Sequence, residues 1–222
     1  MREKKVVPFR NNEGISYSLT QRLLEKGENY GLTAIFPFNI DQIVVAEWVR
    51  LKCHYGCSRF DSNWTCPPAA PDPDKVRTIL DEYELALLLV GTKNCSDFYL
   101  DNGRKRISQV RCWKGTISLE RMLFLEGYYK AFSLVGECCA LCKECAYPEK
   151  CRFPQEKRPS VESFSIDVIG TLENLGQTST LATRTGETYN YYGIILLERN
   201  DSGYWIGNQK RILTNLVGND FL

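Results

Sequence analysis

The sequence predicts an α+β fold in which a small sheet packs against helices and cysteine-rich metal-binding loops lie at the ends of elements. Segments in which apolar residues recur at helical spacing alternate with short apolar runs of strand length. The cysteine-rich segments follow predicted helices and are too long to order easily without an added constraint. A bound metal would supply that constraint.

A helix is predicted to lead into the first cysteine group. Apolar residues from Ile40 to Leu51 recur at helical spacing, and Asn39 or Asp41 can cap the start. This helix would deliver the chain to Cys53.

A second helix and a strand are predicted after the first cysteine group. Pro67-Pro68 forces an extended exit, and Asp72-Pro73 is typical of a helix N-cap followed by proline in the first turn. Residues 84–91 (ELALLLVG) indicate a buried strand.

A longer helix is predicted over residues 117–135, with a Glu126–Lys130 pair one turn apart and Gly136 at its end. It would lead into the second cysteine group. A further helix is predicted from a cap at Ser160 to Gly176.

The remaining C-terminal part is predicted to hold one more strand. Residues 177–188 indicate a loop or hairpin, residues 191–198 (YYGIILLE) indicate the strand, and residues 201–222 fit no single element.

Length and charge set the broad class. The 222 residues, with a net charge of +1, fit one cysteine-rich metal-binding domain over 1–222, with about 30 N-terminal and about 20 C-terminal residues at its periphery. The charge gives no field for nucleic acid or an anionic membrane. No apolar run is long enough to cross a membrane, and no apolar stretch follows the charged N-terminus, so a cytoplasmic location is expected.

Cysteine is the residue type that points to chemistry. The chain has ten cysteines and one histidine, His54. In a reducing cytosol the cysteines favour metal binding or thiol chemistry over disulfides. One histidine excludes a zinc enzyme with several imidazole ligands. The sequence also lacks a glycine-rich dinucleotide motif and a P-loop.

The strongest pattern is a run of three cysteines at two-residue gaps, with a fourth after a gap of five. Its members are Cys139, Cys142, Cys145 and Cys151. Such a run can wrap a 4Fe–4S cubane, as the similar run of bacterial ferredoxins does, although the last gap and the position of Pro154 differ from that motif. A structural zinc site is the main alternative, but zinc sites usually join two separated pairs. Simple core packing does not explain so many cysteines.

Basic residues surround this second group. Cations near an anionic cluster would stabilise its reduced form, and a solvated basic loop is the alternative. The residues concerned are Lys143, Lys150, Arg152, Lys157 and Arg158.

The first group is one ligand short. It consists of Cys53, Cys57 and Cys66. A fourth ligand could be another cysteine, a different group such as His54, or nothing, which would leave one iron open to substrate. The cysteines available for that role are Cys138, Cys112 and Cys95. Cys138 is an additional candidate ligand because adjacent residues rarely bind one cubane, and two-cluster ferredoxins exchange a ligand between motifs. Trp64 is a candidate for shielding a cluster.

The chain resembles the predicted metal-binding proteins of domain of unknown function 2284. The resemblance covers about residues 40–200. It rests on the spaced cysteines followed by Pro67-Pro68, on residues 125–132 (LEGYYKAF), on residues 139–145 (CALCKEC), and on residues 151–168 with their Arg158-Pro159-Ser160-Val161-Glu162 run. It implies metal binding through these cysteines, expected to be iron–sulfur, and it supplies no reaction. Cys95, Cys112 and Cys138 fall outside the family's core pattern.

Three functions are consistent with these residues. The first is an iron–sulfur protein with two 4Fe–4S clusters that passes single electrons to a redox partner protein. The second is an enzyme whose three-cysteine cluster has an open iron that binds a small-molecule substrate for reductive or sulfur-transfer chemistry. The third is an interaction module stabilised by zinc.

Overall fold

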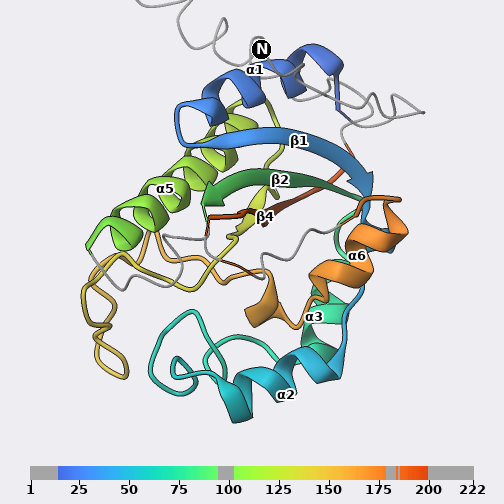
Figure 1. Cartoon of the computed structure of the whole chain (residues 1–222). Coiled ribbons are helices and arrows are strands. Elements are labelled where there is room, and N and C mark those ends of the chain that lie inside the picture. Colours follow the sequence, from blue (N-terminus) through green and yellow to red (C-terminus); the bar gives the residue numbers. More distant parts are fainter. Residues whose placement is uncertain (1–14, 95–102, 179–183, 185, 200–222) are drawn as a thin grey trace, which may run out of the picture.

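The computed structural model describes residues 15–94, 103–178, 184 and 186–199. Within these residues the structure has five α-helices and a four-stranded sheet with the order β1-β2-β4-β3, in which all neighbouring strands are antiparallel (Figure 1). This arrangement confirms the predicted α+β class.

The helices and strands are separated by short turns in some places and by long irregular segments in others, notably between α2 and α3 and between β3 and η2. The α-helices are α1 (Tyr17–Glu28), α2 (Glu47–Gly56), α3 (Pro73–Leu80), α5 (Gly103–Leu125) and α6 (Val168–Asn174). The strands are β1 (Leu32–Asn39), β2 (Leu85–Asn94), β3 (Phe132–Leu134) and β4 (Thr188–Leu197). Two 3-10 turns are η1 (Ile40–Gln42) and η2 (Glu162–Phe164).

The central strand β2 is buried on both faces. Its alternate residues Leu87 and Leu89 belong to one core, together with Leu23 of α1 and Leu119 of α5. The alternating residues Ala86, Leu88 and Val90 belong to a second core on the other face, which α3, η2 and α6 cover. A strand covered on both sides is apolar throughout. The sheet therefore lies between two helical layers, and residues 17–28, part of the segment that the sequence placed at the periphery, pack into the first core.

Several predicted elements are confirmed. Asp72 caps α3, its Oδ1 accepting a hydrogen bond from the Lys75 N–H at 2.8 Å. The strands predicted at 84–91 and 191–198 correspond to β2 and β4, each somewhat longer or shifted. Gly176 follows α6 with φ +64°, a conformation that favours glycine at a helix end. Residues 201–222 lie outside the described residues.

The helix predicted from Ile40 to Leu51 is wrong over its first half. After η1 the chain is extended, and α2 begins only at Glu47. The intervening segment pairs with a distant part of the chain: Val45 bridges Ile166, and the Ala46 N–H donates to the Ser165 carbonyl at 2.9 Å. Tertiary pairing thus overrides the local helical spacing, and Cys53 lies inside α2.

The helix predicted over 117–135 is also wrong at its end. α5 stops at Leu125 because Gly127 takes φ +100°, and residues 132–134 form β3. The predicted Glu126–Lys130 pair does not form, since Glu126 pairs with Arg22 of α1 at 2.7 Å.

The helix predicted from Ser160 to Gly176 is interrupted. Ser165 adopts φ 58°, which ends η2, and Asp167 then caps α6 by accepting from the Gly170 N–H at 3.0 Å. The interruption lets Ile166 reach Val45, and it places Glu162 apart from α6.

No helix in the described part of the chain is long and apolar enough to cross a membrane.

Candidate metal centres

The described part of the chain contains nine cysteines, all of them free thiols. Eight of these separate into two groups of four, and each group lines its own pocket. The first is a cavity of about 420 Å³, here called the Cys53 pocket. Its cysteines are Cys53, Cys57, Cys66 and Cys138. The second, the Cys139 pocket, has about 10 Å³ of free space. Its cysteines are Cys139, Cys142, Cys145 and Cys151.

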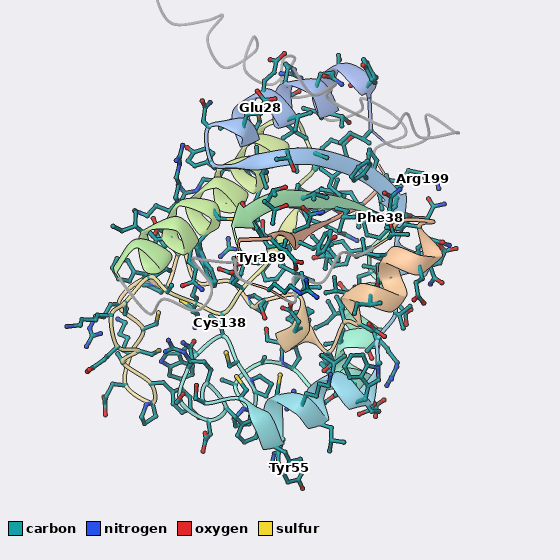
Figure 2. All side chains as sticks on the ribbon, viewed as in Figure 1. Glu28, Phe38, Tyr55, Cys138, Tyr189 and Arg199 are labelled. Atoms are coloured by element: carbon teal, nitrogen blue, oxygen red, sulfur yellow. The ribbon has the colours of Figure 1, made fainter. Side chains whose placement is uncertain are left out.

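The Cys53 pocket draws its thiols from three places in the sequence. Cys53 lies in the last turn of α2 and Cys57 follows that helix, while Cys66 is buried in the turns before α3. Cys138 comes from the segment after β3. Figure 2 shows Cys138 between the ribbon of the cysteine segments and the sheet, with Tyr189 of β4 nearby.

Gly136 allows the segment that carries Cys138 to approach β4. A Cβ atom at this position would lie 2.8 Å from the carbonyl oxygen of Tyr192, which is closer than real Cβ atoms come. Gly136 was predicted to end a helix, but its role here is close backbone contact. The contact fixes the strand exit two residues before Cys138.

The two cysteine-bearing segments hold each other in place (Figure 1). The indole N–H of Trp64, from the first segment, donates to the carbonyl of Glu149 in the second at 2.7 Å. The Tyr147 hydroxyl donates to Asp61 at 3.0 Å, and the rings of Trp64 and Tyr147 meet edge to face at 5.0 Å. Trp64 therefore lines the Cys139 pocket, although it belongs in sequence to the first group.

Burial raises the thiol pKa values most at one cysteine of each pocket. Burial, and then the neighbouring Cys138, raise the pKa of Cys66 to about 12. Burial raises the pKa of Cys139 to about 11, against the lowering effect of the Leu141 N–H. A metal that binds either thiol must displace a proton, so binding is favoured as the pH rises.

Basic side chains line one pocket, and carboxyl groups line the other. Three cations, Arg59, Arg152 and Lys157, line the Cys139 pocket without a described carboxylate. Two carboxyl groups, Glu137 and Glu162, line the Cys53 pocket, and no Lys, Arg or His is among its described lining residues.

Glu162 lies in the concave wall of the Cys53 pocket. Its side chain is exposed to solvent, yet protein surrounds it on the other sides. This burial raises the pKa of Glu162, hydrogen bonds from its own backbone and from Ser160 lower it, and the charge of Glu137 raises it again.

Arg158 serves as an anchor for the exit of the second cysteine segment. It does not line either pocket in the described set, and it binds Glu120 of α5 through two hydrogen bonds, one from Nε at 2.9 Å. The two side chains are 16% and 10% exposed, and the guanidinium lies 5.4 Å from the ring centre of Phe132. Burial acts to raise the pKa of Glu120, but hydrogen bonds from Arg158 and Ser133 bring it below its usual value.

Replacing Glu120 with glutamine is expected to lower the free energy of unfolding by roughly 3 kcal/mol at neutral pH, because Arg158 would remain buried without a counter-charge. Since the pKa of Glu120 is lowered in the folded state, its contribution is present above the usual value of 4.5 and lost as the pH falls. The gap between wild type and Glu120→Gln should therefore close in acid. Denaturant unfolding at several pH values measures it.

The exposed pair of Arg22 and Glu126 supplies the control. Their side chains are 49% and 29% exposed, so solvent screens the pair and Arg22→Gln should change the free energy of unfolding much less than Glu120→Gln does. Equal losses for Glu120→Gln and Arg22→Gln would contradict the anchoring role of Arg158.

Other candidate residues lie away from the pockets. Cys112 packs against the first core, and Cys95 lies outside the described residues. His54 lines neither pocket in the described set and places its ring 4.5 Å from that of Phe60. Lys143 and Lys150 are exposed and are absent from the described pocket walls.

Sequence analysis missed the polar wall of the Cys53 pocket. Glu137, Tyr189 and Asn190 carry no motif, and only the fold brings β4 beside the cysteines. Glu162 did have a signal, because it ends the Arg158–Glu162 run, but that run was equally consistent with a loop and a helix cap.

Within the described residues, no three His, Cys, Asp or Glu side chains lie close enough together to share one metal ion. The thiols of each group instead surround a common pocket.

Comparison with known proteins gives one finding. The chain matches no curated protein and no solved structure. The family model of predicted metal-binding proteins, DUF2284, matches residues 37–197, which include both pockets' cysteines. This chain therefore belongs to the DUF2284 family of predicted metal-binding proteins.

Proposed function

We propose that this protein binds two 4Fe–4S clusters and transfers single electrons to a redox partner protein. The observation that carries the proposal is the division of eight cysteines into two pockets with four thiols each. Four thiolates are the usual ligand set of a cubane. Open thiols of this kind require a compartment that keeps them reduced, in accord with a cytoplasmic location.

Each pocket offers a complete ligand set. The Cys139 pocket would use the four cysteines of the close-spaced run. The first group supplies only three cysteines to the Cys53 pocket. Cys138 would be its fourth ligand. Complete ligation favours an electron carrier, since no iron is left without a protein ligand.

The two pockets differ in how readily they accept a cluster. The Cys53 pocket has ample room at about 420 Å³. The Cys139 pocket has about 10 Å³, so its loop must open around a cubane. The residues that move would be those of the irregular segment 139–151, whose backbone has no helix or strand. The alternative to a cubane in this tight pocket is a single zinc ion. Measuring the zinc and iron content of the purified protein distinguishes the two.

A bound cluster would supply one-electron chemistry without proton transfer. The protein's own residues hold the two sites close together. Trp64 lines the Cys139 pocket, and its ring meets that of Tyr147 edge to face at 5.0 Å. Cys57 is exposed, which gives the Cys53 side an approach from outside.

A second candidate function is supported by the size of the Cys53 pocket. Its wall includes Gln109, Ser163 and Asn190 in addition to the thiols, and these polar groups could bind a small molecule beside a cluster. The protein would then be an enzyme for reductive or sulfur-transfer chemistry. Cys138 would have to leave its iron for that molecule to coordinate.

Ligand sensitivity of the reduced protein distinguishes a carrier from an enzyme. The anaerobically purified protein should bleach with dithionite and regain its absorbance on reoxidation. Its electron paramagnetic resonance spectrum should be unchanged by cyanide or small thiols, because every iron has a cysteine ligand. A changed spectrum would favour the enzyme, and Cys138→Ser, which opens one iron, serves as the responsive control.

A further inference from the structure

We infer that the two sites differ in reduction potential, with the Cys53 site low and the Cys139 site high, so that the electron moves internally from the first to the second. This inference rests on the proposed function, because it assumes a cluster at each site. It concerns the direction of electron flow, which cysteine spacing does not address.

The Cys139 pocket is built to stabilise added negative charge. Lys157 is held over the Trp64 ring at 5.0 Å, and Arg152 donates to the Glu144 carbonyl at 2.8 Å, so both cations have fixed positions beside the thiols. Arg59 reaches the same pocket from the first cysteine segment. Reduction adds one negative charge to a cluster, and fixed cations favour that state.

The Cys53 pocket has the opposite character. Glu137 and Glu162 lie in its wall, and its described lining contains no cation. A cluster in this pocket would lack the fixed cations that favour the reduced state, and the charge of Glu137 would oppose reduction further, so the potential of the site would be lower.

Three other effects act on the Cys53 pocket in the reverse sense. Arg50 lowers the pKa of Cys53, but it does not line the pocket and its guanidinium donates to the Pro71 carbonyl at 2.9 Å. The backbone N–H of Arg59 donates to the Cys57 sulfur, with an N–S distance of 3.4 Å. The Leu141 N–H makes the same kind of bond to Cys139 in the other pocket. Water in the open cavity screens the carboxyl groups. None of these effects places a fixed cation in the wall of the Cys53 pocket. The difference in lining cations therefore sets the order of the two reduction potentials.

The two sites are joined by a single peptide bond. Cys138 lines one pocket and Cys139 the other, and consecutive Cα atoms are about 3.8 Å apart. An electron delivered by a low-potential one-electron donor to the Cys53 site has a short covalent path to the Cys139 site. The transfer oxidises the first site by one electron and reduces the second by one, with no proton required.

Potentiometric titration followed by electron paramagnetic resonance tests the order. Two reduction steps are expected, and Cys142→Ser should remove the higher one while Cys57→Ser removes the lower. Lys157→Gln and Arg152→Gln should lower the higher potential. Gln109→Lys, which adds a cation to the Cys53 wall, should raise the lower one.

Lys150→Gln is the matched control, because it removes one exposed charge from the same loop without altering the pocket wall. A higher potential at the Cys53 site would overturn the inference, as would shifts for Lys157→Gln no larger than for Lys150→Gln. A protein that purifies without iron and sulfide would instead overturn the proposed function, so the two failures are distinguishable.

Discussion

Replacing Cys142 with serine should remove about half of the iron and acid-labile sulfide and leave the rest bound. Cys142 lies in the Cys139 pocket, and the thiols of the other pocket belong to different positions. Serine is a poor ligand for a cubane, so this site should fail alone. Iron and sulfide analysis of the anaerobically purified variant, with its visible spectrum, measures the loss.

Circular dichroism of the same variant makes the result decisive. A folded Cys142→Ser protein that retains the full iron content would show that Cys142 is not a ligand. A folded variant that loses all iron would contradict two independent sites. Cys112→Ser is the matched control and should keep all the metal, because Cys112 lies in neither pocket as described.

Replacing Cys138 with serine should have the second largest effect, and it should affect the other cluster. We expect the Cys53 site to lose its cluster or convert it to a form with an open iron, while the Cys139 site keeps its own. The reason is that Cys138 faces the pocket of Cys53, Cys57 and Cys66, and its charge acts on Cys66.

Double variants check the assignment of Cys138. Cys138→Ser combined with Cys57→Ser should lose no more iron than Cys57→Ser alone, because both residues serve one site. Cys138→Ser combined with Cys142→Ser should affect both sites, so that the Cys139 cluster is lost and the Cys53 cluster is lost or left with an open iron. If Cys138→Ser added to the iron loss of Cys57→Ser but not to that of Cys142→Ser, Cys138 would belong to the Cys139 site.

The assignment of Cys138 shows how far the sequence could go. Spacing identified the close run ending at Cys151, since such a loop is local. It could not show which of Cys138, Cys112 and Cys95 would accompany the first group, because that depends on how distant parts of the chain pack together. In the fold Gly136 lies in close contact with β4, and the adjacent Cys138 and Cys139 line different pockets.

The elements show the same division between local and tertiary causes. The cap at Asp72 and the apolar strand β2 were predictable because both depend on residues close together in the sequence. The extended segment around Val45 was not, since its partner Ile166 lies far along the chain. The carboxyl group of Glu162 reaches the Cys53 pocket through that same pairing of distant segments.

Metal and sulfide analysis of the full chain, purified without oxygen, tests the central claim most directly. Two cubanes predict a brown protein with about eight irons and about eight acid-labile sulfides per chain. Four irons with one zinc would restrict the claim to one pocket. Stoichiometric zinc without iron or sulfide would contradict it.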